Sequence, residues 1–253
     1  MAVVETVKLD LQMTVYLGGG GNSVVLQSED RQKAIVVDTK YFSGARLLRR
    51  QVTASEITLI NTHFHLDHAR GNRLYPKAVV VSGETNWKQW DFDTAHSKRP
   101  DRVLKVGEQA DFVLDDETVR IVDLGKAHSP NDLIVLFEKR KVLVAGDLVW
   151  VNMHPVLLDG NTNIESWIGF LDKMERDYDI ETVVPGHGLI AGRTAITEMK
   201  EYFVSIRRSL GQHSELKRLK QKYSSYGTFP VFGGFQRTVA ILRKAVRRKT
   251  GAA

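Results

Sequence analysis

The stretch LINTHFHLDHARGN, residues 59–72, places four groups that can bind a metal ion within six positions. They are His63, His65, Asp67 and His68. Imidazole nitrogens and carboxylate oxygens form compact shells around zinc and similar divalent ions, at about 2.0–2.2 Å. The alternative interpretation is an ordinary polar loop. Four local groups cannot complete two four-coordinate shells, so a metal site would need further ligands from elsewhere in the chain.

The residues before this motif predict how it is positioned. The segment EITLIN, residues 56–61, is rich in β-branched residues and predicts a strand. Because side chains alternate along an extended chain, we expect His63 and His65 on the same side, where both can reach one ion. Asp67 and His68 follow where the chain begins to turn toward a helix. We expect them beside a neighbouring second ion.

Three further candidates lie at the ends of later predicted strands. His128 follows RIVDLG, Asp147 ends VLVAGD, and His187 follows ETVVP. Loops at strand ends are where α/β proteins usually place their chemistry. Each of these residues alone has an ordinary interpretation as a loop residue, but the joint pattern favours one shared metal site.

The rest of the chain alternates predicted strands and helices, which indicates the α/β class. Six short segments and a hairpin that turns near 138–141 are predicted as strands: 24–28, 33–39, 56–61, 77–83, 111–115, 118–124 and 132–147. Helices are predicted at 43–51 with Ser43 as the N-cap, near 84–90, and over 163–177, where apolar residues recur at helical spacing. After Arg193 the sequence predicts two helices, separated at YGTFPVFGG.

Composition limits the chemistry and the setting. The chain has 253 residues, of which 42% are hydrophobic, so it can bury a large core. It has no cysteine, which excludes disulfides, thiolate ligands and cysteine nucleophiles. No apolar run approaches the roughly 20 residues that span a bilayer. Residues 1–20 lack the pattern of a secretory signal, so we expect a cytoplasmic protein that does not bind a membrane, although a signal peptide already removed would leave no trace.

Charge is concentrated at the C-terminal end. From Met199 onward the sequence has 13 Lys and Arg against two acidic residues, whereas the first 198 residues have 23 basic and 28 acidic residues. Such a segment can contact nucleic acid or an anionic surface. A solvated helix face is the favoured interpretation, because the charges show no aromatic interleaving and no nucleic-acid-binding motif accompanies them. We therefore expect a small molecule as the partner rather than nucleic acid.

The local sequences around the seven candidates resemble the metallo-β-lactamase superfamily. The matching pattern is HFHLDH at 63–68, a histidine before SPND, an aspartate in AGD and a histidine in PGHG, and it extends over about 18–192. The resemblance implies an αβ/βα four-layer sandwich with two metals at one edge of the sheets. It also implies a catalytic domain over 1–192 and a basic helical C-terminal extension over 193–253 packed on it.

Carried over by position, the resemblance assigns all seven metal ligands. It implies that a first ion is bound by His63, His65 and His128, a second by Asp67, His68 and His187, and that Asp147 bridges them. Two Zn²⁺ are expected, with iron or manganese as alternatives. The β-lactamase branch often has arginine and cysteine in place of His68 and Asp147. The site therefore resembles the glyoxalase II, lactonase and broad-hydrolase pattern more closely.

Other positions are assigned around this site. Asp38 matches an aspartate that supports the metal site, as a carboxylate that accepts a ligand histidine's N–H would. Asp132 matches another frequent family aspartate. The family commonly has glycine where Lys40 stands, which leaves the conformation of that loop open. The run GGGGNS, residues 18–23, is interpreted as a flexible flap near the site, and Trp87, Trp90, Trp150 and His154 as possible pocket residues.

The chemistry expected from two adjacent ions is hydrolysis. A water bridging them would lose a proton near neutral pH, and the hydroxide would attack the carbonyl of a small ester, thioester, lactone or β-lactam-like substrate. Asp67 is expected to orient this nucleophile. One alternative is an oxidoreductase that resembles persulfide dioxygenases and uses a single iron. A nuclease is disfavoured, since only about 40 residues separate Asp147 from His187 and no nucleic-acid-binding domain is recognisable there.

Overall fold

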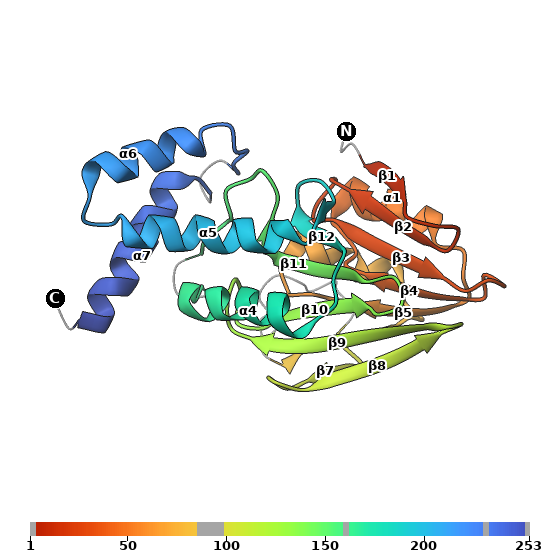
Figure 1. Ribbon diagram of the computed structural model, residues 1–253. Coiled ribbons are helices and arrows are strands. Elements are labelled where there is room, and N and C mark those ends of the chain that lie inside the picture. Colours follow the sequence, from red (N-terminus) through yellow and green to blue (C-terminus); the bar gives the residue numbers. More distant parts are fainter. Residues whose placement is uncertain (1–3, 85–98, 159–161, 230–232, 251–253) are drawn as a thin grey trace.

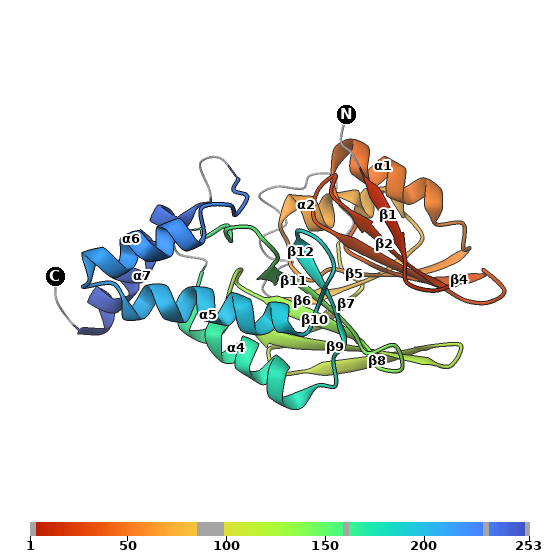
Figure 2. The same cartoon turned by 45° about the horizontal axis from the view of Figure 1, so that its top comes forward.

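Two β-sheets packed face to face, with helices on both outer sides, form the protein (Figures 1 and 2). This computed structural model describes residues 4–84, 99–158, 162–229 and 233–250. The predicted αβ/βα sandwich is confirmed. Among the described residues, no helix combines the length and the apolar character needed to cross a membrane.

The first sheet has its described strands in sequence order, antiparallel from β1 to β4 and parallel from β4 to β7. The strands are β1 Glu5–Lys8, β2 Met13–Leu17, β3 Ser23–Gln27, β4 Lys33–Val37, β5 Glu56–Ile60, β6 Val79–Gly83 and β7 Arg102–Leu104. Because β4 and β5 run parallel, their carboxyl ends lie at the same edge of the sheet. The HFHLDH motif begins just after β5, at this edge.

The second sheet has the order β13-β12-β11-β10-β9-β8. Its strands are β8 Gln109–Leu114, β9 Glu117–Gly125, β10 Asp132–Phe137, β11 Val142–Trp150, β12 Thr182–His187 and β13 Ala191–Gly192. The predicted hairpin is confirmed, with β10 and β11 antiparallel on either side of residues 138–141. Strand β12 pairs parallel with β11, so the ends of both strands reach the same edge.

Helices cover the outer face of each sheet, and Figure 1 shows α4 and α5 across the second one. Their bounds are α1 Phe42–Gln51, α2 Leu66–Ala69, α4 Ile164–Asp177, α5 Thr194–Arg208, α6 His213–Lys222 and α7 Phe235–Thr250. A 3-10 turn, η1 Arg70–Leu74, follows α2. The Asn163 side chain caps α4 by accepting a hydrogen bond from the backbone N–H of Ser166.

Two helix predictions are corrected. The N-cap of α1 is Tyr41, so Ser43 lies inside the first turn and is not the cap. The chain after Arg193 forms three described helices rather than two, because it also breaks after Arg208, where Gly211 precedes α6. Apart from Glu84, the helix predicted near 84–90 lies outside the described residues, as do Trp87 and Trp90.

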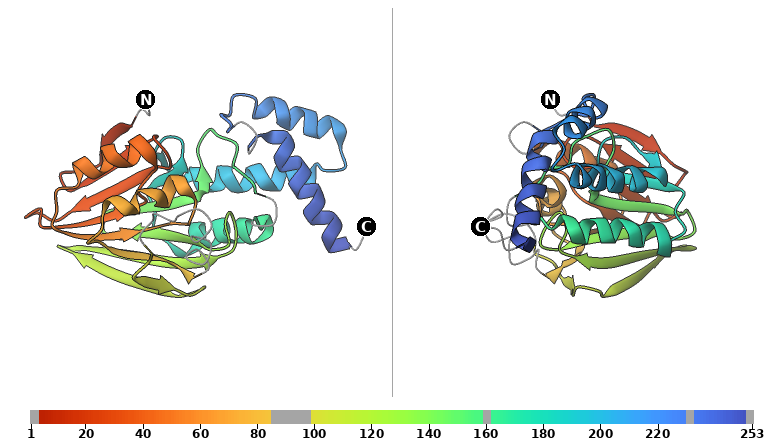
Figure 3. Two further views of the ribbon diagram at one scale, coloured as in Figure 1. Left: turned by 180° about the vertical axis from the view of Figure 1, so that it is seen from behind. Right: turned by 60° about the vertical axis from the view of Figure 1, so that its left-hand side comes forward.

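Three apolar clusters match the layers of the sandwich. One lies between the sheets, one lies under α1 and η1, and the largest joins the outer face of the second sheet to α4. The largest cluster continues through α5, α6 and α7, with Phe203, Leu216 and Leu242 buried in it. Figure 3 shows α6 and α7 at the end of the molecule remote from β1–β4. The C-terminal helices thus pack on the second sheet through one shared core.

Candidate metal centre

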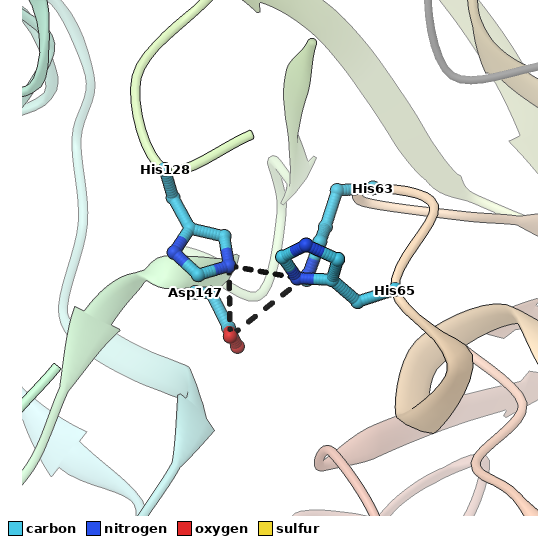
Figure 4. Close-up of side chains that lie close together, drawn as sticks. All are labelled: His63, His65, His128 and Asp147. Carbon is cyan, nitrogen blue, oxygen red and sulfur yellow. Dashed lines mark hydrogen bonds and ion pairs between the residues drawn. The ribbon is translucent and has the colours of Figure 1, made fainter. Parts of the chain in front are cut away.

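A first group of side chains converges at the edge where the two sheets meet (Figure 4). His63 and His65 come from the loop after β5, His128 from the loop after β9, and Asp147 from β11. His65 Nδ1 lies 3.0 Å from both His63 Nε2 and His128 Nε2. Asp147 Oδ2 lies 3.2 Å from His128 Nε2 and 3.8 Å from His63 Nε2. Four potential ligand atoms therefore face one point.

A second group lies beside the first. Asp67 and His68 are in α2, and His187 ends β12. Asp67 Oδ2 is 3.1 Å from His187 Nε2 and 3.7 Å from His68 Nε2. The short helix α2 begins directly after His65, and this turn directs Asp67 and His68 away from the first group. One motif thus serves two adjacent groups.

Asp147 lies between the two groups. Its Oδ2 faces His63 and His128, while its Oδ1 lies 3.1 Å from His68 Nε2 and 3.4 Å from His187 Nε2. The residue is 5% exposed, so water does not surround its carboxylate. One buried carboxylate thus presents an oxygen to each group.

Hydrogen bonding alone does not satisfy these atoms. A ring nitrogen has either one N–H or one lone pair, so His65 Nδ1 cannot pair with two imidazoles at once. His68 Nε2 and Asp147 Oδ1 have no hydrogen bond of acceptable geometry within the described part of the chain. Ligand atoms of a tetrahedral zinc site lie about 3.3 Å apart, which follows from zinc–nitrogen distances of about 2.0–2.1 Å. The donor set and its spacing therefore fit divalent metal ions.

The protonation states also suit metal ligands. Burial, with the neighbouring histidines, lowers the pKa of His63 well below its usual value, and burial lowers the pKa of His128 to about 3. Burial opposes ionisation of Asp67 and Asp147, yet the surrounding histidines lower the pKa of both carboxyls. Both imidazoles are therefore neutral and both carboxylates are charged at neutral pH. This is the form in which these groups bind metals.

His68 is the exception. Burial disfavours its charged form, but Asp147, Asp38 and Asp67 together raise its pKa well above the usual value. Three carboxylates around one imidazole create an excess of negative charge in a buried region. Without a metal the proton on His68 compensates for part of it, and a divalent cation would compensate more fully.

Asp38 fixes the orientation of His68. Its Oδ2 lies 2.6 Å from His68 Nδ1 and accepts a hydrogen bond from Thr62 Oγ1 at 2.7 Å, while its Oδ1 accepts from the Thr62 backbone N–H. His68 Nδ1 pairs with the Asp38 carboxyl, and this contact turns Nε2 toward Asp147. Asp38 has φ of 58°, an uncommon left-handed conformation for this residue type.

Asp132 acts on the loop of His128. Its carboxylate accepts hydrogen bonds from the backbone N–H groups of Ala127 and Ser129, the two residues that flank His128. Burial raises the pKa of Asp132 to about 7. The contact fixes the loop backbone rather than the imidazole itself, which the sequence pattern did not specify.

Lys40 is a component that sequence reasoning did not assign. It is fully buried, and its Nζ donates to the carbonyls of Tyr16, Gly18 and Gly21 at 2.8, 2.7 and 2.7 Å. The Gly21 N–H in turn donates to the carbonyl of Asp67 at 3.0 Å. Lys40 therefore holds the glycine-rich segment, interpreted above as a flap, against the second group. The three carbonyls lie about 19 to 24 positions before Lys40 in the sequence, so no local pattern predicts these hydrogen bonds.

Glycine at 186 makes room for the bridging carboxylate. A Cβ at this position would lie 2.0 Å from Asp147 Oδ1, closer than any real contact. We expect Gly186→Ala to displace Asp147 and lower metal affinity and any metal-dependent turnover by about 100-fold, at the upper end of effects seen when ligand orientation is disturbed. Metal titration and turnover measurements would check this.

Gly169→Ala is the matched control. No described atom lies within 4 Å of a Cβ at this exposed position in α4. Alanine there should leave the metal centre unchanged and raise the free energy of unfolding by up to about 1 kcal/mol through helix propensity. Equal metal affinity in the two variants would contradict the assigned crowding at Gly186.

Aromatic residues border the second group. The Trp150 ring stacks on His187 with 4.3 Å between centroids, and Phe229 packs edge-on against the same imidazole at 5.1 Å. Trp150 and Phe229 both line a cavity at the site. Phe229, from the segment YGTFPVFGG that separates the predicted C-terminal helices, therefore supplies part of the pocket wall. His154 lies elsewhere, buried with Nδ1 2.8 Å from the Tyr202 hydroxyl.

Known proteins share this fold. The structure superposes on a metallo-beta-lactamase from Pontibacter korlensis with a TM-score of 0.68 at 16% identity, covering 79% of this chain and 98% of that one. For the crystal structure of VMB-1 at pH 5.5 the TM-score is 0.65, the identity 19% and the coverages 78% and 94%. A double mutant of the sec-alkyl sulfatase PisA1 gives a TM-score of 0.72 at 10% identity, covering 96% of this chain and 50% of that one.

Those identities establish a common fold and no more. Family membership comes from the sequence model of the metallo-beta-lactamase superfamily, which matches residues 16–187, more than half of the chain. The matched region includes all seven residues of the candidate metal centre. The chain therefore belongs to the metallo-beta-lactamase superfamily.

Proposed function

We propose that this protein is a dinuclear zinc hydrolase that cleaves a carbonyl bond in a small ester, thioester, lactone or β-lactam-like substrate. The observation that carries the proposal is the position of Asp147, with one oxygen toward each of two adjacent groups. A single ion would leave one of these groups without a cation. In this proposal His63, His65 and His128 bind the first ion, and Asp67, His68 and His187 bind the second.

Each remaining part of the site has a task in this chemistry. Two bound divalent ions would lower the pKa of water toward about 7 and polarise the carbonyl under attack. Asp67 is the carboxylate that can reach water or substrate, since its side chain is 26% exposed against 4% for Asp147 and 1% for Asp38. We assign to Asp67 the orientation of the attacking water. Asp38 and Asp132 hold His68 and the His128 loop in position.

The first experiment is to measure the metal content of the purified protein by elemental mass spectrometry, beside a panel assay of ester, lactone, thioester and β-lactam hydrolysis. We expect about two zinc ions per chain and hydrolysis of at least one class. Chelation should abolish turnover and lower the melting temperature, because buried carboxylates then lose their counter-charge.

A different metal content would redirect the assignment. One iron per chain with no hydrolysis and with oxygen consumption on a persulfide would replace the hydrolase by a persulfide-oxidising enzyme. A chain that retained two zinc ions and turnover after His65→Ala with Asp67→Ala would show that the assigned residues are wrong.

A further inference from the structure

The space around the metal centre restricts which substrates fit it. Two cavities of about 540 and 680 Å³ meet at the site and share Tyr41, Asp67, His187 and Phe229. A carbonyl at the metal centre therefore has room for a group on either side. The chemistry of the two cavity walls then decides what these groups are.

The smaller cavity has apolar walls. Beyond the metal-site side chains it is lined mainly by Phe42, Leu66, Trp150, Val156 and Leu158, with Phe229 at the junction. Such a wall stabilises an apolar group by roughly 25 cal/mol for each Å² removed from water.

The larger cavity adds the apolar side chains of Leu17, Val151, Met153 and Leu189, together with Asn22, Asn152 and the glycines at 18–20 and 188. Its charged lining residue outside the metal-site set is Glu5, which would repel an anion. Among the described residues, no lysine or arginine lines either cavity. An anionic group that extends from the metal centre into either cavity would thus meet no lysine or arginine among the described lining residues.

The positive charges of the C-terminal helices do not supply that partner. Lys217, Lys220 and Arg237 line a separate cavity, with His154, that shares no lining residue with the other two. The C-terminal extension contributes the Phe229 ring to the site. Phe229 packs edge-on against Trp150, with 5.9 Å between centroids, and against His187.

From these walls we propose that the substrate is an uncharged ester or lactone with apolar groups on both sides of the scissile carbonyl. This inference rests on the proposed hydrolytic function and narrows it. Substrates whose anionic groups extend into either cavity, away from the metal ions, are disfavoured. Phe229 is a specificity-determining residue, because it borders both cavities.

The test compares two esters of matched shape, p-nitrophenyl butyrate and p-nitrophenyl hemisuccinate, on the metal-loaded protein. They share the leaving group and differ in a terminal methyl against a carboxylate. We expect kcat/KM to be roughly tenfold or more higher for the butyrate. The kcat/KM for p-nitrophenyl butyrate should also exceed the kcat/KM for p-nitrophenyl acetate by about fifteenfold, as expected for two additional buried methylene groups.

Substitutions at Phe229 test the wall itself. Phe229→Ala should reduce the butyrate-over-acetate preference to a few-fold, and Phe229→Lys should shift the preference toward the hemisuccinate by about tenfold. Phe112→Ala is the control, since it truncates a half-buried phenylalanine of β8 that lines neither cavity at the site. It should leave both ratios unchanged.

The outcomes separate this inference from the proposed function. Hydrolysis of the hemisuccinate as fast as the butyrate would overturn the apolar-substrate inference while leaving the hydrolase assignment intact. If no ester is hydrolysed, binding of two uncleavable ketones, butyrophenone and 3-benzoylpropionate, is compared by isothermal titration calorimetry. Tighter binding of butyrophenone would support the apolar pocket without hydrolysis, and tighter binding of 3-benzoylpropionate would overturn it.

Discussion

Replacing Asp147 with asparagine is expected to lower hydrolytic turnover by about a thousandfold and to reduce the bound metal to less than one ion per chain. The side chain is buried between four imidazoles and presents one oxygen to each metal group. Asparagine keeps the shape but removes the charge that both groups share. Loss of metal-derived stabilisation of several kcal/mol corresponds to a rate loss of this size.

Asp67→Asn gives the sharpest comparison for this experiment. Asp67 contacts His68 and His187 but lies outside the first group, so we expect the variant to lose one ion and retain the other. Asp111→Asn, at an exposed residue paired with Arg120, is the control and should retain both. Elemental analysis, zinc titration and ester turnover are measured on all three. If Asp147→Asn kept two ions, the bridging assignment would be lost.

The convergence of the candidate metal ligands was largely predictable, because its sequence signal is local and chemical. Five residues of the candidate centre are histidines and two are aspartates. The histidines at 63, 65, 128 and 187 stand at or soon after a strand, whereas Asp67 and His68 lie in α2. Asp147, predicted at a strand end, lies inside β11, which continues to Trp150. Ends of strands that run in the same direction lie at one edge of a sheet, which brings His128 and His187 together at the ends of β9 and β12. His63 follows β5 of the other sheet, so its approach depends on how the two sheets pack. The exact distances among these histidines depend on packing and are not encoded locally.

Elements with weak local signals were missed. Strand β1, Glu5–Lys8, has mostly exposed side chains and lies at the sheet edge, so its composition does not announce it. The break between α5 and α6 contains Gly211 but no proline, and both flanking segments are amphipathic. For short or edge elements, pairing with the rest of the fold decides the structure, and this information is not in the segment.

The residues around the candidate metal centre were harder still to predict. Phe229 reaches the pocket from about 40 positions after His187, since the C-terminal helices fold back onto the second sheet. Lys40 looked like a departure from the family pattern. In the structure its buried amino group donates to three carbonyls, and burial lowers its pKa to about 7. Both effects come from tertiary contacts and have no spacing rule that could reveal them.

The role of Lys40 gives the second large effect, on stability. We expect Lys40→Met to lower the free energy of unfolding by about 3 kcal/mol, because three carbonyls of the segment 16–21 lose their donor. A buried polar group left without a partner costs about 1–3 kcal/mol, and part of the total is offset since the ammonium no longer has to be desolvated. Lys8→Met, at an exposed position in β1, is the matched control and should change stability by less than about 0.5 kcal/mol.

The same variant should also affect the metal centre through the backbone. Gly21 donates to the carbonyl of Asp67, and a Cβ at Gly21 would lie within 2.3 Å of the His68 ring, so this segment packs directly on the second group. Loss of the Lys40 hydrogen bonds should speed amide hydrogen exchange at residues 18–21. It should also lower the affinity for the second ion more than the affinity for the first. If Lys40→Met matched Lys8→Met in both stability and exchange, the three hydrogen bonds would contribute nothing. The glycine-rich segment would then be held by its packing alone.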